Sequence, residues 1–283
     1  MKIYDLVILG ADGFIGSHFY SKYKKKIKIY KVGKKFGDLK KKNIWKKLPK
    51  AKILLNLASR VFVPKSWEEI DLFIDNNIKI TLNSLAYCKK NNSKNIYISS
   101  YIYGNSKLPT DENEQVKINN PYSLSKKMGE DLCEFYSNFH DVKSLILRPF
   151  NIYGPKQDKR FLIPSIINQI KKKNVIINDI RPQRDLLYVD DFCKLIFRTL
   201  NFKNKFSIYN IGSGKSYSIR QIIECLKFIT NINIKIINKK NFRQNEILKT
   251  QAGIRKVIKN FNWHPTTDLK QGLKRIIDEK FSN

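Results

Sequence analysis

The chain has 283 residues and carries 55 lysine and arginine residues against 24 aspartate and glutamate residues, a formal net charge of +31. A hydrophobic content of 42% excludes a disordered protein, and the length allows one large domain or a domain with a smaller partner. The lysines are spread over the whole chain with many Asn and Ile residues. This spread indicates a compositional bias, so a dedicated nucleic-acid surface is not expected.

The N-terminal sequence MKIYDLVILGADGFIG contains an apolar run that meets glycine within ten residues. The run is too short to span a membrane and no cleavage-site pattern follows it, so we expect a cytoplasmic protein with no membrane partner. Cys88, Cys133, Cys193 and Cys225 form no C-x-x-C pair, and the three histidines are scattered. We therefore expect reduced thiols and no metal site.

Short apolar runs alternate with helical stretches along the first half of the chain. The apolar runs are YDLVILG at 4–10 and the segments at 27–32, 52–59, 95–100 and 143–150. The helical stretches are 14–24, 68–90 and 121–139. Continuous apolar runs are typical of strands buried on both faces. The alternation predicts an α/β fold, with a Rossmann-type doubly wound parallel sheet over residues 1–150.

The regularity changes after residue 150. A helix is expected at 162–173, a strand at 175–178, another helix after RDLLYVDD (184–191), and a strand at 207–212. Two amphipathic helices follow near the C-terminus. We expect residues 186–212 to return to the first domain, and residues 151–185 and 213–283 to form a smaller α/β substrate-binding lobe.

A glycine turn follows the first strand directly. GADGFIGSH places Gly10, Gly13 and Gly16 at G-x-x-G-x-x-G spacing, with Phe14 and Ile15 between the last two. Glycines between a first strand and a first helix permit a tight turn and let a pyrophosphate approach the backbone N–H groups of the helix. This segment predicts a dinucleotide-binding site.

The residue after the second strand normally selects the dinucleotide. An acid there binds the ribose 2′-hydroxyl of NAD, whereas basic side chains accept the 2′-phosphate of NADP. Here Gly33, Lys34 and Lys35 follow the strand, and no acid occurs before Asp38. NADP(H) is therefore the preferred cofactor, with NAD(H) as the alternative.

Tyr122 and Lys126 are four residues apart in NNPYSLSKKMGE (119–130), which predicts the first turns of a helix. Residues at this spacing share one helix face, so the ammonium can favour the phenolate and make Tyr122 a proton donor or acceptor near neutral pH. A surface tyrosine beside a solvated lysine is the alternative on this segment alone.

Nine segments in order resemble the extended short-chain dehydrogenase/reductase family, which contains nucleotide-sugar epimerases, dehydratases and reductases. The segments are GADGFIG, GDL (37–39), NLAS (56–59), DNNIKITLNSL (75–85), ISSYIYG (98–104), NPYSLSK (120–126), RPFNIYGP (148–155), RDLLYVDD (184–191) and NIGSG (210–214). The resemblance covers nearly the whole chain.

The resemblance implies that Tyr122, Lys126 and Ser99 are catalytic. In such enzymes the tyrosine exchanges a proton with a sugar hydroxyl or ketone while hydride passes between that carbon and the nicotinamide. The lysine holds the nicotinamide ribose and lowers the pKa of the tyrosine. Ser99 matches a Ser or Thr that hydrogen-bonds the same oxygen; the alternative is a hydroxyl that caps local backbone.

The resemblance also implies further binding residues. The cofactor would be bordered by Asp38 and Leu39 at the adenine, Ala58 at the pyrophosphate, Asn77, and Pro149 and Phe150 at the nicotinamide. The substrate would meet Ser99, Ser100, Tyr101, Asn151, Arg184, Arg243 and Glu246, of which Asn151 and Arg184 would hold its diphosphate and the last two its phosphate and ribose. Where many relatives have Ala-Asp, this chain has Ala252-Gly253, so that contact is open.

The residues after Ser99 separate the reactions of the family. Sugar 4,6-dehydratases have Asp-Glu where this chain has Ser100 and Tyr101, so dehydration is not expected. GDP-fucose synthases have a cysteine at the position of Tyr101 and a histidine beyond the RPFNIYG-like segment, and this chain has neither. Epimerisation of a carbon acid by that pair is excluded.

The sequence therefore predicts an NADPH-dependent 4-ketoreductase that acts on a nucleotide-linked 4-keto-6-deoxyhexose in deoxysugar or surface polysaccharide biosynthesis. The alternative is an NAD-dependent 4-epimerase similar to UDP-glucose 4-epimerase. An inactive relative that binds RNA is a more distant alternative, against which the presence of Ser99, Tyr122 and Lys126 argues. A nucleotide-diphosphate sugar is the expected ligand, and a homodimer the expected assembly.

Overall fold

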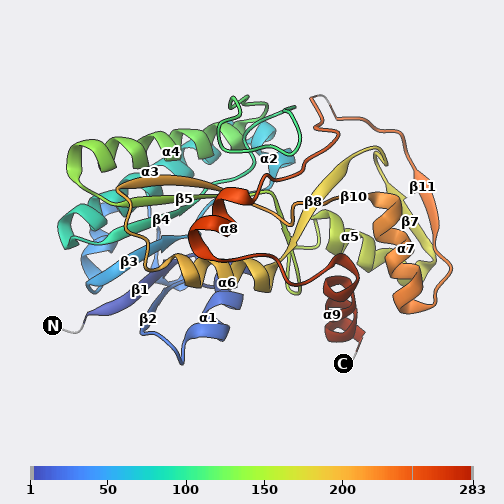
Figure 1. Cartoon of the computed structure of the whole chain (residues 1–283), viewed down its shortest axis with the longest axis horizontal. Helices are drawn as coiled ribbons and strands as arrows, with labels where there is room; N and C mark the ends of the chain where they lie inside the picture. The colour runs from blue at the N-terminus through green and yellow to red at the C-terminus, as the bar shows by residue number, and fades with distance from the viewer. Residues whose placement is uncertain (1–2, 244, 282–283) are drawn as a thin grey trace. The chain divides into compact units, whose positions relative to one another are not determined.

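The computed structural model describes residues 3–243 and 245–281, whose backbone divides into two compact units (Figure 1). Unit 1 takes in the described residues of Met1–Gly104, with Gln115–Pro149 and Ile196–Tyr209. Unit 2 takes in Asn105–Glu114, Phe150–Leu195 and the described residues of Asn210–Asn283. Relative to the boundaries expected from the sequence, residues 105–114, 150, 186–195 and 210–212 group with unit 2.

Unit 1 is built on a six-stranded sheet formed by the apolar runs. In spatial order the strands are β2 (Ile29–Val32), β1 (Tyr4–Leu9), β3 (Ala51–Asn56), β4 (Lys94–Ile98), β5 (Ser144–Pro149) and β9 (Phe206–Ile211). The pairings from β2 to β5 are all parallel. The winding direction changes between β1 and β3, and in such sheets ligands bind at this switch point, beyond the carboxyl ends of the strands.

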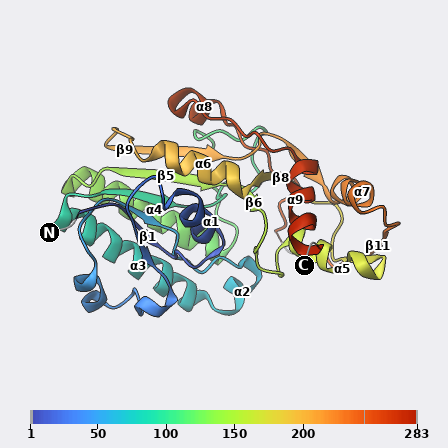
Figure 2. The same ribbon diagram turned by 90° about the horizontal axis from the view of Figure 1, so that it is seen from below.

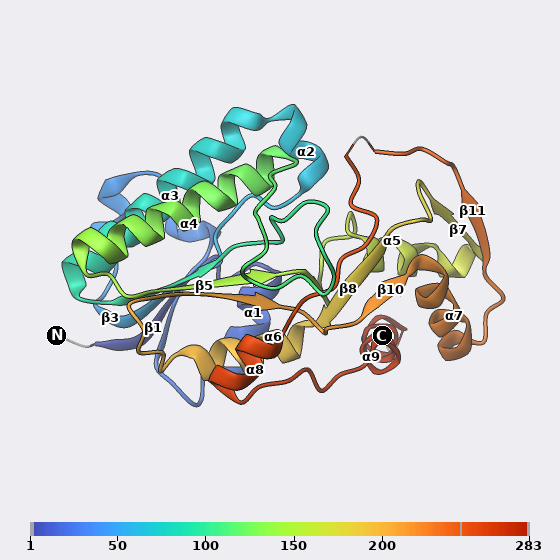
Figure 3. The same cartoon turned by 45° about the horizontal axis from the view of Figure 1, so that its top comes forward.

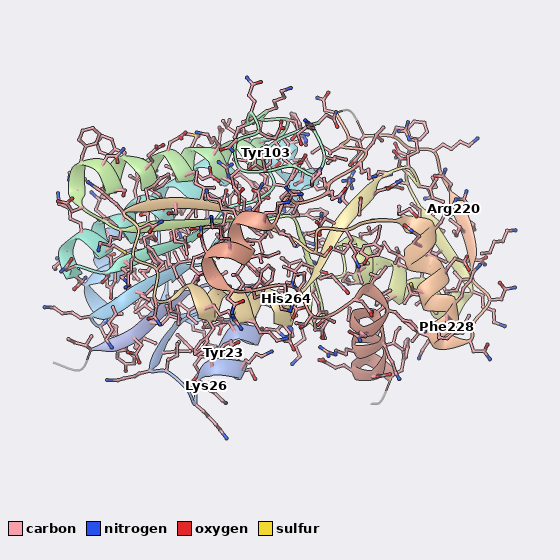
Figure 4. All side chains as sticks on the ribbon, in the orientation of Figure 1. Tyr23, Lys26, Tyr103, Arg220, Phe228 and His264 are labelled. Atoms are coloured by element: carbon pink, nitrogen blue, oxygen red, sulfur yellow. The ribbon has the colours of Figure 1, made fainter. Side chains whose placement is uncertain are left out.

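Helices cover both faces of this sheet (Figure 3). Helix α1 (Phe14–Tyr23) lies on one face, and α3 (Ile70–Asn91) and α4 (Pro121–His140) lie side by side on the other. On the α1 face, Tyr23, labelled in Figure 4, stacks on Phe197 of α6 (Val189–Thr199) with ring centroids 4.3 Å apart.

Helix α4 begins where its sequence favours a helix start. The side chain of Asn120 accepts a hydrogen bond from the backbone N–H of Ser123 at 2.8 Å, and Pro121 is the first helical residue. The helix ends at His140, because the next residue, Asp141, has a left-handed backbone (φ 54°). These ends fix the position of Tyr122 in the first turn.

A buried ion pair joins α4 to β5 within unit 1. The Arg148 guanidinium donates two hydrogen bonds to the Glu130 carboxylate, at 2.9 and 2.6 Å, and a third to the Tyr103 hydroxyl at 2.6 Å. Burial alone would lower the pKa of Arg148, but the contact with Glu130 raises it above its usual range. A buried charge without its partner is costly, so this pair holds α4 against β5. Tyr103 is labelled in Figure 4.

Unit 2 contains two small sheets and several helices (Figure 2). The three-stranded sheet has β8 (Gln183–Tyr188) at its centre, parallel to β6 (Asn151–Tyr153) and antiparallel to β10 (Ser216–Ser218). The second sheet pairs β7 (Asn174–Ile177) with β11 (Lys235–Asn238) in parallel. The helices wholly within unit 2 are α5 (Leu162–Gln169), α7 (Ile219–Thr230), α8 (Arg255–Phe261) and α9 (Leu269–Phe281).

The predicted Rossmann-type fold is confirmed, with shifts at the ends of elements. The stretch predicted as one helix at 68–90 contains the end of α2 (Val63–Glu68) and most of α3, because the backbone at Glu69 (φ −127°, ψ 49°) leaves the helical region. The helix expected at 162–173 ends at Gln169 and continues as a 3₁₀ turn. Among the described residues, no helix has both the length and the apolar character needed to cross a bilayer.

Candidate active site

The glycine turn follows β1 and leads into α1. Gly10 has φ +74°, and a Cβ atom there would lie 3.0 Å from the backbone nitrogen of Ala58, so only glycine fits. The N–H of Gly13 donates to the Gly10 carbonyl at 3.0 Å, and no side chain caps the helix start. Phe14, Ile15 and Gly16 form the first turn of α1. This backbone cradle fits the pyrophosphate of a dinucleotide.

The end of β2 carries the two predicted basic residues. Lys34 and Lys35 begin a short 3₁₀ turn and are both exposed. The Asp38 carboxylate accepts the backbone N–H of Lys40 at 3.0 Å and is exposed. Leu39 is half-buried, and its carbonyl accepts the Trp45 indole N–H at 2.8 Å. Lys34 and Lys35 thus follow β2 after Gly33, whereas Asp38 and Leu39 follow the 3₁₀ turn.

The segment after β3 is held by Asn77, a residue expected at the cofactor. Its carbonyl oxygen accepts the backbone N–H of Arg60 at 2.9 Å and the Ser59 hydroxyl at 3.2 Å. Its amide nitrogen donates to the Ser125 hydroxyl at 2.8 Å. Asn77 is buried, so its side chain joins α3, the segment after β3 and α4. The Ala58 N–H donates to Asn56 at 3.1 Å.

Ser99 comes directly after β4. Its backbone N–H donates to the Leu147 carbonyl at 2.8 Å, which ties it to β5. Its hydroxyl oxygen is buried and has no hydrogen-bond partner among the described residues. An unpartnered buried hydroxyl is costly, and binding a ligand oxygen would remove that cost. Such a group fits a role in substrate binding better than a backbone cap.

Lys126 is almost fully buried, one turn after Tyr122 on α4. Its ammonium lies 4.7 Å from the centre of the Tyr97 ring and donates to the Ser59 hydroxyl at 3.4 Å. Burial lowers the pKa of Lys126 to about 7, although the negative charge of Glu130 opposes this shift. The sequence did not single out Ser59 or Tyr97.

Tyr122 behaves differently from the expectation based on spacing. Part of the residue is exposed, but the protein around the phenol desolvates it and raises its pKa to about 12, while a hydrogen bond with Ser100 opposes the rise. Lys126 does not lower the pKa of Tyr122 here, because its ammonium is directed to Tyr97 and Ser59. Lys126 is thus not among the causes of this shift, and the expected activation of Tyr122 by Lys126 stays a prediction.

Two residues beside Ser99 have defined contacts. Ser100 hydrogen-bonds Tyr122, and the Tyr101 hydroxyl donates to the Gly104 carbonyl at 2.5 Å.

Pro149 ends β5 and is buried. Phe150, also buried, begins a segment of unit 2, where its N–H donates to the Ile211 carbonyl at 2.8 Å.

Unit 2 brings three of the four remaining predicted substrate residues together. The Arg184 guanidinium donates to the Glu246 carboxylate and, at 2.6 Å, to the Ile247 carbonyl. Arg243 lies 3.9 Å from the other oxygen of Glu246. One carboxylate thus serves two guanidinium groups, which leaves a positive excess suited to phosphate oxygens. Asn151, in contrast, donates its amide to the Asp185 carbonyl at 3.1 Å.

Asp185 is a buried residue that the sequence analysis did not single out. Its carboxylate accepts the backbone N–H groups of Ser213 at 2.6 Å, Gly214 at 3.0 Å and Ala252 at 2.9 Å. Burial raises its pKa, although these hydrogen bonds oppose the shift. Asp185 therefore links the NIGSG turn to Ala252, which belongs to the Ala252-Gly253 pair where many relatives have Ala-Asp.

Over residues 3–243 and 245–281, no three His, Cys, Asp or Glu side chains gather in a way that could hold a metal ion. Cys88, Cys133 and Cys193 are buried and Cys225 is partly exposed, and all four are free thiols.

A family model described as NAD dependent epimerase/dehydratase family matches residues 6–212. The chain belongs to this family. The resemblance seen in the sequence is therefore confirmed, and a nicotinamide dinucleotide is the cofactor of this epimerase/dehydratase family.

Two relatives and one solved structure align with almost the whole chain. A protein of Methanocaldococcus jannaschii named putative UDP-glucose 4-epimerase is 28% identical, over 96% of this chain and 97% of its own length. The GDP-6-deoxy-D-mannose reductase of Pseudomonas aeruginosa is 27% identical, over 97% and 96%. The solved structure of RMD from Pseudomonas aeruginosa, complexed with NADPH, has a TM-score of 0.88 at 27% identity and covers 99% of this chain and 98% of that one.

Proposed function

We propose that the chain reduces the ketone of a nucleotide-linked 4-keto-6-deoxyhexose to the 4-hydroxy sugar with NADPH, in deoxysugar or surface polysaccharide biosynthesis. The observation that carries the proposal is the unpartnered hydroxyl of Ser99 at the end of β4, in the same unit as Tyr122, Lys126 and the glycine turn. Ser99, Tyr122, Lys126 and the glycine turn are the features that reduction of a ketone by a nicotinamide cofactor would need.

The bound nicotinamide would supply the hydride. Ser99 would hydrogen-bond the ketone oxygen, since its hydroxyl has no partner among the residues that the structure describes. Tyr122 would give its proton to the same oxygen as the hydride arrives, and its raised pKa of about 12 keeps it protonated before the reaction. Ser100 hydrogen-bonds the phenol and would orient it. Lys126 would hold the nicotinamide ribose.

The contacts of Ser100 and Tyr101 support reduction over dehydration. Elimination of water needs an acid and a base beside the serine, and here one of these positions hydrogen-bonds Tyr122 while the other donates to the Gly104 carbonyl. Neither side chain is a carboxylate. Ser100 and Tyr101 therefore do not fit the acid and base of a dehydratase.

NADPH is preferred in this proposal because Lys34 and Lys35 are exposed at the end of β2 and neither ammonium has an ion-pair partner among the described residues. Charge-assisted contacts to a 2′-phosphate contribute about 1.5–3 kcal/mol, roughly ten- to a hundred-fold in affinity. The Lys34→Ala, Lys35→Ala double variant should lose this preference. Equal dissociation constants for NADPH and NADH in the wild type would reject it.

The sugar nucleotide would be held in unit 2 by Arg184 and Arg243, which share the single carboxylate of Glu246. A diphosphate would accept hydrogen bonds from both guanidinium groups. Arg184→Ala or Arg243→Ala should raise KM for the sugar nucleotide, and leave the dissociation constant of NADPH unchanged.

A 4-epimerase that keeps its NAD is the second candidate, favoured by the similarity to the protein named putative UDP-glucose 4-epimerase. Such an enzyme would use Ser99, Tyr122 and Lys126 in both directions and return the hydride to the same sugar. The two candidates differ in cofactor stoichiometry.

A homodimer is part of the proposal. Leu124, Met128, Phe135 and Phe139 of α4 are 41%, 37%, 49% and 71% exposed, and their spacing places them on one side of the helix. A stripe on a single helix can pair with its own copy across a two-fold axis. Light scattering of the wild type and of the Phe135→Ser, Phe139→Ser variant would test this: a monomeric wild type contradicts it.

The reaction is tested with a panel of nucleotide-linked 4-keto-6-deoxyhexoses and NADPH. We expect nicotinamide absorbance to fall in step with product for at least one sugar, and to depend on Ser99 and Tyr122. Interconversion of UDP-glucose and UDP-galactose without added NADPH, by protein that carries bound NAD, would establish the epimerase instead.

A further inference from the structure

The glycine turn contains one acidic residue, Asp12, that the sequence analysis did not use. Its carboxylate accepts the backbone N–H of Lys34 at 3.2 Å and lies 3.6 Å from the Lys31 ammonium. Its side chain is 47% exposed, so solvent and ligands reach it. Asp12 therefore contacts the residues after β2 from the turn that follows β1.

The pairing of β1 with β2 explains this placement. Leu9 of β1 is in register with Val32 of β2, and the N–H groups of Gly10 and Ala11 both donate to the Val32 carbonyl, at 2.9 and 3.1 Å. The next residue, Asp12, is therefore held beside Gly33. A Cβ atom at position 33 would lie 1.7 Å from an Asp12 carboxylate oxygen, so the Asp12 carboxylate fills the space beside Gly33, the residue after β2.

In dinucleotide-binding folds, the position just after the second strand is where the adenine ribose is recognised: an acid there binds the 2′-hydroxyl of NAD, and a basic residue accommodates the 2′-phosphate of NADP. We propose that Asp12 supplies a carboxylate at this position from the glycine turn. This carboxylate opposes the preference for NADPH that the lysines of β2 and its 3₁₀ turn create. The inference rests on the dinucleotide site of the proposed function and is independent of the sugar substrate.

The charges at this position act in opposite directions. Lys34 and Lys35 attract a 2′-phosphate, whereas Asp12 repels it. Asp12 also accepts the hydrogen bond from the Lys34 N–H, which is then not available to a phosphate oxygen. NADPH therefore binds only when Asp12 moves away or the repulsion is overcome, while the ribose hydroxyls of NADH can donate to Asp12 directly. The protein thus discriminates between the two cofactors less than its two lysines alone would predict.

The alternative is that Asp12 has only a structural role and holds the glycine turn against the end of β2. A purely structural role would affect both cofactors equally, because both bind the same turn. A selectivity residue changes the ratio of the two dissociation constants. The ratio therefore separates the two roles.

The test measures the dissociation constants of NADPH and NADH by quenching of tryptophan fluorescence, for the wild type and Asp12→Asn in 150 mM salt. Asparagine keeps the size of the side chain and an oxygen that accepts the Lys34 N–H, but removes the charge. We expect NADPH to bind about ten-fold more tightly to Asp12→Asn, the order expected for removing one negative charge beside a doubly charged phosphate at a high effective dielectric constant. NADH should not bind more tightly.

Asp5→Asn is the matched control. Asp5 lies on β1, at the opposite end of the strand from the glycine turn. Its carboxylate also accepts a backbone N–H, from Lys28 at 2.9 Å, and a hydrogen bond from the Lys52 ammonium at 2.8 Å. It removes the same charge without touching the cofactor site. A ratio in Asp12→Asn that stays within two-fold of the wild type, or that shifts as much in Asp5→Asn, would overturn the proposal. This binding test does not depend on turnover, so a failure of the proposed reaction is seen separately.

Discussion

We predict that Lys126 makes cofactor binding depend on pH. Its pKa is lowered to about 7 because the ammonium is buried, and the Glu130 carboxylate, which opposes this shift, is itself paired with Arg148. A dinucleotide that places its ribose hydroxyls and diphosphate near Lys126 favours the charged form. The pKa of Lys126 then rises, and the protein takes up a proton when the cofactor binds.

The magnitude follows from the pKa of about 7. At pH 8 a lysine with this pKa is charged in about one tenth of the molecules, so binding takes up about 0.9 proton if the bound state is fully charged. The apparent affinity should fall by up to about ten-fold for each pH unit above this pKa, because each unit removes nine tenths of the charged form. Below pH 6 the free protein is already charged and the dependence disappears.

The assay is titration calorimetry of NADPH at pH 8 in HEPES and in Tris, whose ionisation enthalpies differ. The 2′-phosphate, whose second pKa is about 6, is fully ionised at this pH and contributes little to the proton uptake. The slope of the observed enthalpy against the ionisation enthalpy of the buffer gives the number of protons taken up. We expect about 0.9 for the wild type, by the arithmetic above.

Lys126→Met should give a slope near zero. Lys127→Met is the matched control, because Lys127 is the next residue and pairs with Asp131 on the side of α4. Its slope should equal that of the wild type. A slope near zero in the wild type refutes the reasoning, whatever the variants show.

Three further predictions concern catalysis and stability. Tyr122→Phe should bind NADPH normally and turn over at least about 100-fold more slowly, the lower end for loss of a positioned proton donor; wild-type turnover would contradict the catalytic assignment. Glu130→Gln leaves the Arg148 charge buried and should lower the free energy of unfolding in urea by about 3–5 kcal/mol, while Glu134→Gln, a helical turn further along α4, should leave it nearly unchanged. Burial alone would raise the pKa of Asp191, but hydrogen bonds from Thr266 and neighbouring groups lower it. The melting temperature should therefore fall in Asp191→Asn at pH 7, and this difference should shrink as pH falls through the lowered pKa; a constant difference would argue against it.

The fold and the glycine turn could be predicted because both depend on short stretches of sequence. A continuous apolar run such as that of β1 indicates a strand buried on both faces, and its position before Gly10 predicts a phosphate-binding turn. The φ of +74° at Gly10 agrees with this prediction. The break at Glu69 could not be predicted, since the flanking segments both favour helix.

The contacts of Asp12 and Asp185 could not be predicted, because their partners are distant in sequence. Asp12 meets Lys34 only through the register of β1 with β2. Asp185 accepts N–H groups from residues 28 to 67 positions later. An isolated acid in a lysine-rich chain carries no signal for such a role.

The pKa values of Tyr122 and Lys126 depend on burial as well as on their spacing along the helix. The i, i+4 spacing correctly predicts that Tyr122 and Lys126 share a helix, but the sign of each pKa shift depends on burial, which spacing does not report. Near neutral pH part of the protein has an uncharged Lys126, which cannot favour the phenolate. Binding of the cofactor would charge Lys126 through proton uptake and so place a cation one turn from Tyr122. Activation of the tyrosine would then follow cofactor binding, which links the proton uptake in calorimetry to the turnover that Tyr122→Phe tests.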